Sequence, residues 1–200
     1  MQKREFLMKT SVAVAAAAFA LAGCTTTTPS QADKSDSAPG ANANKRREID
    51  ASVNGALDKM YASVQGSREL VNKARGVLVF PSVLQAGFVV GGEYGEGALR
   101  VGGATQGYYN TVTASFGLQI GAQSKAVIFL FMTQDALDKF QRTDGWTAGA
   151  DASVAVVKMG ANGAVDLNTA TSPVEVIVMT NAGLMANLNI EGTKVTRLKI

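Results

Sequence analysis

Most of the chain beyond residue 76 consists of short apolar or β-branched runs separated by glycine, proline, asparagine and serine. This spacing predicts short strands joined by tight turns, and it lacks the alternation of strands with long helices that is typical of a doubly wound sheet. We therefore expect a mainly antiparallel β-sheet that curls into a sandwich or an open barrel. The nine predicted strands are Val77–Phe80, Gly87–Val90, Ala98–Val101, Thr111–Ile120, Ala126–Met132, Ala152–Val157, Val174–Met179, Leu184–Ile190 and Lys194–Leu198.

The residues before this sheet have helical periodicity. Apolar side chains recur every three or four positions from Ile49 to Val64, which places them on one face of an α-helix. Ser67 follows a break in this pattern and can cap a second, short helix that runs to about Lys73. A third helix is predicted after Thr133, which can cap it. The predicted fold class is α+β, with N-terminal helices packed on the sheet.

The first residues have the pattern of a bacterial lipoprotein signal. A basic start is followed by an uncharged run from Ser11 to Leu21, which is too short to span a bilayer. Small residues then lead to Cys24, the single cysteine of the chain. This pattern predicts that residues 1–23 are a signal peptide and that the Cys24 thiol is acylated. The alternative is an ordinary secretory signal in which the cysteine is incidental.

The segment after the cysteine is expected to be a tether. Residues 25–44 contain no large apolar side chain, so they cannot bury enough surface to offset the entropy of ordering. We assign residues 24–44 to the acylated cysteine and a disordered tether, and residues 45–200 to one folded domain. Thr25, which is not aspartate, follows the cysteine. By similarity to Gram-negative sorting signals, this predicts an outer-membrane anchor with the domain in the periplasm.

Charge and composition exclude several functions. Without residues 1–23 the chain loses three of its 19 basic and one of its 16 acidic residues, which leaves a net charge of +1. This balance argues against nucleic-acid binding, which needs a concentrated basic surface. The chain has no histidine, so it cannot form Ser-His-Asp triads or imidazole zinc sites. We expect no cofactor, no metal and no enzymatic activity.

Positive charge is concentrated in the predicted N-terminal helices. Residues 45–75 carry a net charge of +3, whereas residues 76–200 carry −1. The first helix could lie at a lipid interface with its basic groups on phosphates, or it could pack its apolar face on the sheet. We favour packing for the apolar face, because acidic residues are interspersed among the basic ones. The candidate headgroup-binding residues are Lys45, Arg46, Arg47, Lys59, Arg68, Lys73 and Arg75.

Two other segments are weaker candidates for chemistry. Gly91–Gly97 fits neither nucleotide-binding glycine pattern, so we expect a β-turn or bulge with close backbone packing. Within it, Glu93 and Glu96 could act as an acid–base pair, but exposed turn carboxylates are the commoner outcome. Trp146 could stack on a ligand near Asp151, although such a tryptophan is more often part of the core.

Seven motifs follow one another along the chain: Ala74–Pro81, Gly87–Gly97, Phe116–Gln123, Leu137–Phe140, Gly149–Val154, Gly183–Ala186 and Leu188–Gly192. In this order they resemble the SYLF domain, also described as a yeast-type actin-regulator or lipid-binding domain. The resemblance covers about Leu57–Leu198. The chain departs from the family at Gly107–Asn110, where many members have a Trp-Ser-x-Pro segment.

This resemblance implies a lipid-facing module. Eukaryotic members bind phosphoinositides through a basic, amphipathic N-terminal region, and some bind or bundle actin. The seven basic residues named above occupy the corresponding region here. We therefore expect a non-enzymatic envelope lipoprotein that binds anionic phospholipid headgroups. The alternative is a structural or assembly lipoprotein that holds an envelope or host protein partner.

Overall fold

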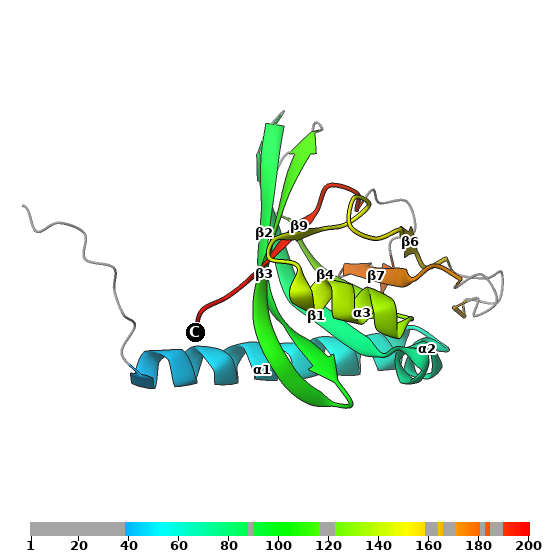
Figure 1. Ribbon diagram of the computed structural model, residues 1–200, viewed down its shortest axis with the longest axis horizontal. Helices are drawn as coiled ribbons and strands as arrows, with labels where there is room; N and C mark the ends of the chain where they lie inside the picture. Colours follow the sequence, from blue (N-terminus) through cyan, green and yellow to red (C-terminus); the bar gives the residue numbers. More distant parts are fainter. Residues whose placement is uncertain are drawn as a thin grey trace, which may run out of the picture. The chain divides into compact units, whose positions relative to one another are not determined.

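Figure 1 shows a computed structural model of the chain. The structure describes residues 39–87, 90–116, 123–158, 164–165, 171–180, 183–184 and 190–200. All of them belong to one compact unit, Ser37–Ile200. The predicted signal peptide, Cys24 and the first part of the predicted tether lie outside the described residues.

Helix α1 (Pro39–Ser63) begins six residues before the predicted boundary at Lys45. Residues 39–44, which the sequence places in the tether, are therefore helical. A proline suits the first turn of a helix, because its φ is already helical and its missing N–H has no partner there. The predicted apolar face is confirmed, with Leu57 half-buried and four side chains almost fully buried: Ile49, Val53, Met60 and Val64.

Helix α2 (Ser67–Lys73) follows at once, but Ser67 does not cap it as predicted. Gly66 occupies the cap position with a φ of 84°, a backbone conformation that glycine adopts without strain. The buried Ser67 hydroxyl instead donates to the carbonyl oxygens of Val64, over 2.6 Å, and Met60, over 3.3 Å. Ser67 therefore ties the start of α2 to the last turn of α1.

The sheet contains nine strands among the described residues, in the order β5-β9-β3-β2-β1-β4-β7-β6, with β8 paired to β7. All pairs are antiparallel except β6 with β7. The strands form one curled sheet, a half-barrel, rather than two packed sheets, and the predicted α+β class is confirmed. Their bounds are β1 (Gly76–Gly87), β2 (Val90–Val101), β3 (Ala104–Phe116), β4 (Gln123–Phe131), β5 (Trp146–Thr147), β6 (Val154–Val156), β7 (Val174–Thr180), β8 (Gly183–Leu184) and β9 (Lys194–Arg197).

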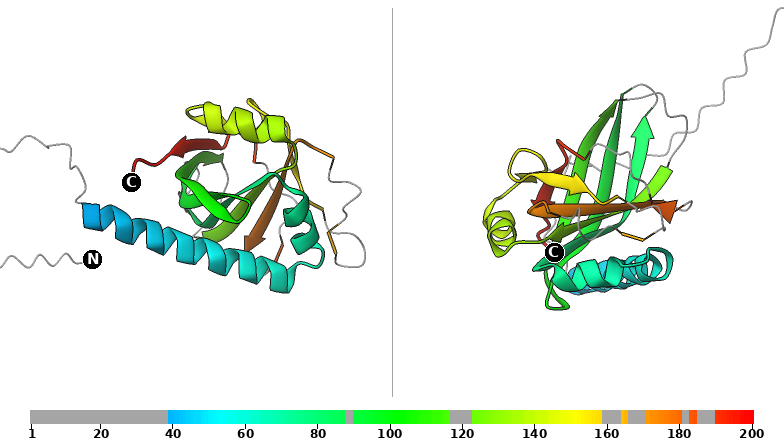
Figure 2. Two further views of the ribbon diagram at one scale, coloured as in Figure 1. Left: turned by 60° about the horizontal axis from the view of Figure 1, so that its bottom comes forward. Right: turned by 90° about the vertical axis from the view of Figure 1, so that its right-hand side faces the viewer.

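Each face of the sheet has its own hydrophobic core. Inside the curl, aromatic residues including Phe129 and the fully buried Trp146 pack under helix α3 (Gln134–Arg142). The predicted cap of α3 is confirmed, because Thr133 Oγ1 accepts from Ala136 N. On the outer face, α1 and α2 cover residues such as Ile128. Figure 2 shows α1 and α3 on opposite sides of the curled strands.

We predicted a β-turn or a bulge at the glycine-rich segment Gly91–Gly97, but this segment lies within strand β2. A bulge in β1 between Val79 and Ser82 brings the two backbones together, and a Cβ at Gly97 would lie 2.0 Å from the Val79 carbonyl oxygen. The expected close backbone packing is therefore present, but its cause lies in the neighbouring strand. Because side chains alternate along a strand, Glu93 and Glu96 point to opposite faces of the sheet.

Candidate functional site

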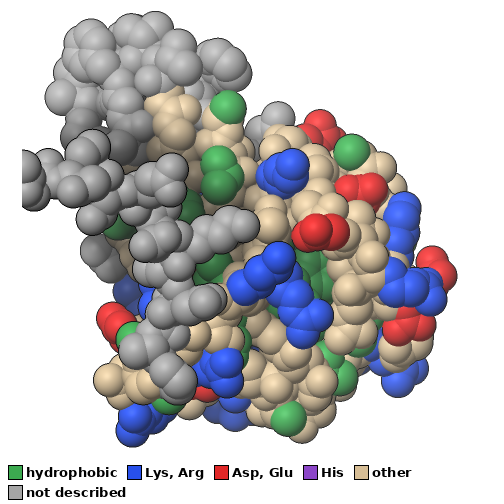
Figure 3. Space-filling model, turned by 60° about the vertical axis from the view of Figure 1, so that its left-hand side comes forward, with side chains coloured by type: hydrophobic (Ala, Val, Ile, Leu, Met, Phe, Trp, Pro, Cys, Tyr) green, Lys and Arg blue, Asp and Glu red, His purple; other side chains and the backbone are tan. Residues whose placement is uncertain are grey.

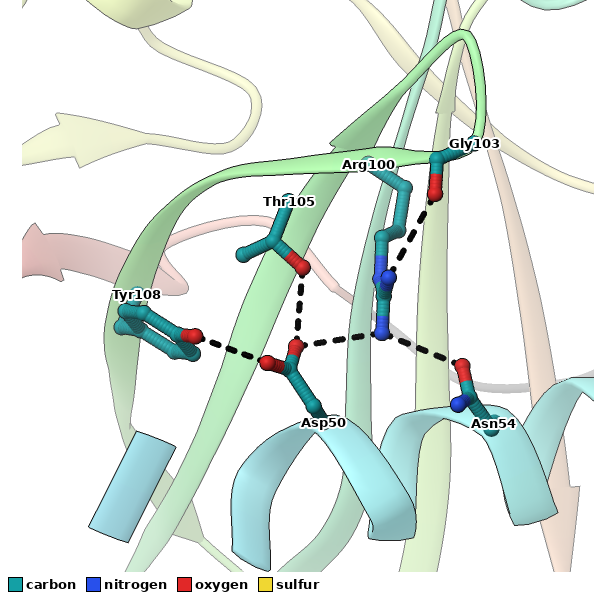
Figure 4. A network of polar contacts seen from close by, with 6 residues as sticks. All are labelled: Asp50, Asn54, Arg100, Gly103, Thr105 and Tyr108. Carbon is teal, nitrogen blue, oxygen red and sulfur yellow. Dashed lines mark hydrogen bonds and ion pairs between the residues drawn. The ribbon is translucent and has the colours of Figure 1, made fainter. Parts of the chain in front are cut away.

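A single carboxylate joins helix α1 to the sheet. Asp50 accepts hydrogen bonds from the hydroxyls of Thr105 and Tyr108, each over 2.8 Å, and its Oδ1 lies 3.1 Å from Arg100 Nη2 (Figure 4). Burial, followed by the bond to Asp50, raises the pKa of the Tyr108 phenol. Tyr108 therefore stays protonated, and its hydroxyl donates a hydrogen bond to the Asp50 carboxylate. These contacts hold α1 across strands β2 and β3.

Beside this network lies a pocket of about 360 Å³. It is enclosed by the second half of α1, by α2 with the start of β1, and by the turn from β2 to β3. We call it the arginine pocket, because two guanidinium side chains contribute to its lining. Its polar lining residues are Asn54, Tyr61, Asn72, Arg75 and Arg100.

The Arg100 guanidinium is held in place by hydrogen bonds, but not all of its N–H groups have a good acceptor. Its Nη2 donates to Asp50 Oδ1 and Asn54 Oδ1, each over 3.1 Å, and its Nη1 makes a weak contact of 3.4 Å with the Gly103 carbonyl oxygen. Its Nε is buried and has no acceptor in the part of the chain that the structure describes. The fold therefore leaves part of the donor capacity of Arg100 unused.

Two further arginines stand at the same end of α1. The backbone N–H of Arg75 donates to the Phe131 carbonyl oxygen over 2.7 Å, which fixes the link from α2 to β1 while the side chain remains exposed. The Arg68 guanidinium lies 4.2 Å from the centre of the Tyr61 ring. Burial raises the pKa of the Tyr61 phenol, and Arg68 only partly offsets this, so Tyr61 is a neutral donor at physiological pH.

Only part of the predicted basic set is near the arginine pocket. Arg75 lines the pocket, and Arg68 covers a ring that also lines it. Lys73 pairs with Glu69 on the outside of α2, over 3.1 Å. Lys59, on α1, lines a small separate pocket beside Pro81.

The other three predicted residues lie near the N-terminal end of α1. Positions 45 and 61 are about 24 Å apart along a helix. Lys45 Nζ is 2.8 Å from Glu96 Oε2, and the bond to Glu96 raises the lysine pKa. Arg46 Nε donates over 3.0 Å to the Ile200 backbone oxygen, and Arg47 bonds Asn44 within its own helix. Accordingly, Figure 3 shows basic side chains interleaved with acidic ones rather than one continuous basic field.

Sequence reasoning missed Arg100. It lies in a predicted strand, Ala98–Val101, which we read only as part of the sheet. One signal was present in the sequence: a single charged residue inside an apolar run, which must find a partner or face solvent. Its partners come from α1, some 50 positions earlier, and no local pattern shows that pairing.

The other side chains that the sequence suggested for catalysis or ligand binding make contacts within the fold. Trp146 is fully buried in the core, as the commoner reading predicted. Asp151 Oδ2 accepts from the Thr147 backbone N–H over 2.7 Å within a turn. Glu93 forms an ion pair with Lys125 inside the curl, over 2.8 Å. Within the described ranges, no group of three acidic, cysteine or histidine side chains is placed to hold a metal ion.

Comparison with known families identifies the domain. Residues 112–199 match the model of the Ysc84 family, described as Las17-binding protein actin regulator. This is the family that also carries the name SYLF. This part of the chain, residues 112–199, is similar to the SYLF domain. A search of the curated proteins found no match.

The matched part of the SYLF domain runs from β3 to just beyond β9. It includes the inner-core residues from Val127 to Val195, but none of the residues that line the arginine pocket. Helices α1 and α2 and strand β2, which carries Arg100, lie before the match. Their assignment to the domain rests on the shared sheet and on the motifs from Ala74 to Gly97. No helix in the described ranges is both long enough and apolar enough to cross a bilayer.

Proposed function

We propose that this SYLF-domain protein is a lipid-anchored envelope protein whose folded unit binds the phosphate of anionic phospholipid headgroups. In this proposal residues 1–23 export the chain, acylated Cys24 holds it in the outer membrane, and the domain faces the periplasm. The domain does not catalyse a reaction. An exported protein does not meet actin, so we carry over lipid binding from the family and not actin regulation.

The arginine pocket is the observation that carries this proposal. Arg75 and Arg100 line it together with two asparagine amides and the Tyr61 phenol. Guanidinium groups offer paired N–H donors whose geometry suits phosphate oxygens, and charged hydrogen bonds of this kind are the stronger ones. Asp50 neutralises one of the two charges, so the pocket keeps a positive charge through Arg75. A pocket with these donors suits one phosphate group.

The seven predicted residues then contribute unequally. We expect Arg75 and Arg68 to matter most, because they lie at or beside the arginine pocket. Lys45 and Lys73 are already paired with carboxylates, so their gain from a headgroup is smaller. Arg47, exposed near the start of α1, adds a weaker attraction to an anionic surface.

The absence of catalysis in this proposal is supported by three features. The chain has no histidine, and Glu93 and Glu96 lie on opposite faces of β2 and so cannot flank one bond. The Asp151 carboxylate accepts from a backbone N–H in its own turn. These arrangements fit structural roles for the acidic residues.

The test is flotation of the chain from residue 24 onward, with Cys24→Ser, on vesicles of phosphatidylcholine with and without phosphatidylglycerol, at low and high salt. Both hydrophobic cores consist of residues from Ile49 onward, so this chain retains the whole folded unit. We expect binding to the anionic vesicles alone, weakened by salt. Arg75→Glu changes the local charge by two units, and each unit near an anionic surface contributes about 1 kcal/mol, so this variant should bind roughly thirtyfold more weakly.

Arg142→Glu is the matched control, because Arg142 is an exposed arginine at the end of α3, on the other side of the sheet. The proposal fails if binding is insensitive to salt and to Arg75→Glu, or if both arginine variants behave alike. No binding to either vesicle would leave the acyl chains as the membrane contact and direct the search to protein partners. Metabolic labelling with palmitate tests the anchor itself: the label should be lost in full-length Cys24→Ser.

A further inference from the structure

Three exposed apolar side chains form one row across the sheet. Leu84 on β1, Tyr94 on β2 and Val112 on β3 are 55%, 46% and 50% exposed. They are the large hydrophobic residues with exposed side chains among those that the structure describes. Leu84 is the register partner of Tyr94, and Tyr94 is the register partner of Val112. We call these three residues the apolar row.

The apolar row lies on the outer face of the sheet, the face that carries α1. Tyr94 shares a face of β2 with Ala98, which is fully buried in the core under α1. Strands β1 to β3 continue past α1, and none of the helices that the structure describes lies over this extension (Figure 2). Between the apolar row and α1 runs a groove of about 410 Å³ that Leu84, Tyr94, Ile49 and Lys45 help to line.

Polar groups border the apolar row, as is typical of a surface that contacts both an apolar phase and water. The Tyr94 hydroxyl donates to Glu96 Oε1 over 2.8 Å, and the same carboxylate pairs with Lys45. At the other end, Val112 is the register partner of the exposed Lys194. An aromatic ring with a hydrogen-bonded hydroxyl, flanked by lysines, is the composition found at membrane–water interfaces.

We propose that the apolar row enters the interfacial layer of the membrane that anchors the protein. This inference rests on the proposed function. Fifteen residue steps separate Cys24 from Pro39, a reach of at most about 50 Å. Lys45, two turns into α1, borders the apolar row, so this row lies at the anchored end of the folded unit. Aliphatic and aromatic groups that remain in water in the free protein would gain free energy in that layer.

The experiment places a fluorescent reporter on the apolar row. Cys24→Ser removes the single native cysteine, so Leu84→Cys can be labelled uniquely with the environment-sensitive dye NBD. An N-terminal histidine tag on residue 24 and a nickel-chelating lipid then hold the chain at its N-terminus, as the acyl anchor would. This attachment does not depend on the arginine pocket, so a failure of headgroup binding does not prevent the measurement.

We expect NBD at position 84 to shift to the blue, to at least double in intensity on vesicles, and to be quenched by lipids that carry a spin label on the acyl chain. The matched control is Asp135→Cys, at an exposed position in the first turn of α3 on the other side of the sheet, whose emission should stay unchanged. In the untagged chain, Tyr94→Ser should lower binding to anionic vesicles at least fivefold with unchanged circular dichroism.

An unchanged spectrum at position 84, or equal responses at positions 84 and 135, would overturn this inference. If the untagged chain still floats on anionic vesicles in that case, the proposed function stands and the apolar row faces another occupant, such as a protein. If the untagged chain does not float but position 84 still responds when tethered, headgroup binding fails and membrane insertion of the apolar row stands.

Discussion

Arg100 Nη2 on strand β2 lies 3.1 Å from Asp50 Oδ1 on helix α1, and the two side chains are 17% and 32% exposed. The same carboxylate accepts hydrogen bonds from the hydroxyls of Thr105 and Tyr108 on β3. One residue of α1 therefore satisfies donors from two strands and sets the position of Arg100 in the arginine pocket. Tyr108 belongs to the segment Gly107–Asn110, where many SYLF domains have a Trp-Ser-x-Pro segment instead.

Asp50→Ala should be strongly destabilising. It leaves the Arg100 charge without its carboxylate and two hydroxyls without their acceptor, a loss of about 2–4 kcal/mol in the free energy of unfolding. Urea unfolding followed by circular dichroism measures it. Asp58→Ala, at an exposed position of the same helix, should change stability by less than about 0.5 kcal/mol. Similar losses in both variants would contradict a special role for Asp50.

The fold class could be predicted from periodicity, because the helical face from Ile49 to Val64 and the Thr133 cap are local signals. Features that depend on strand pairing could not be predicted from periodicity. The glycine-rich segment was predicted to be a turn or bulge because of its local composition, whereas it pairs with β1 and β3 as part of strand β2. Arg100 and the apolar row likewise acquire their surroundings from register, which a single sequence does not show.

The distribution of basic residues along the sequence predicted the candidate site only in part. The seven predicted basic residues lie within 31 positions of one another, yet α1 separates the first three from the arginine pocket by several turns. Helix geometry turns a compact segment of sequence into an extended surface. Sequence reasoning found Arg75, which lines the pocket, but not Arg100, which completes it.

Gly97→Ala should disrupt the β1–β2 pairing. Its Cβ would lie 2.0 Å from the Val79 carbonyl oxygen and 2.8 Å from Phe80, so the backbone at the bulge must move. Overpacking of this kind costs about 1–3 kcal/mol or more. In the same strand Gly92→Ala meets nothing within 4 Å and should leave the melting temperature unchanged or slightly raised. Thermal melts of the two variants compare them directly, and equal melting temperatures would rule out the steric argument.

The ion pair inside the curl should show strong coupling. Lys125 Nζ lies 2.8 Å from Glu93 Oε1, and both side chains are only 10% exposed. Removal of one partner leaves a buried charge unpaired, so Lys125→Met and Glu93→Gln should each cost about 3–5 kcal/mol. The double variant should cost less than the sum, with a coupling on the order of 1–3 kcal/mol. A double-mutant cycle by urea unfolding measures this coupling, and additive losses would show that the two groups do not interact.

Glu175 on β7 should make the protein less stable as the pH rises from acidic to neutral. Its side chain is almost fully buried, and burial raises its pKa, although the Ser172 N–H that donates to Oε1 over 2.9 Å acts in the opposite direction. Between the unfolded pKa, about 4.3, and the higher native pKa, the native state holds a proton that the unfolded state has released. The contribution of Glu175 to the free energy of unfolding therefore decreases as the pH rises between these two pKa values, and it stays low at higher pH.

Glu175→Gln removes this titration and keeps an amide oxygen to accept from the Ser172 N–H. The variant should gain stability relative to the original chain as the pH rises from the unfolded pKa, about 4.3, through the higher native pKa, and the difference in melting temperature should level off above it. Parallel pH profiles for the original chain and Glu175→Gln would mean that the carboxyl titrates alike in the folded and unfolded states, which its almost complete burial argues against.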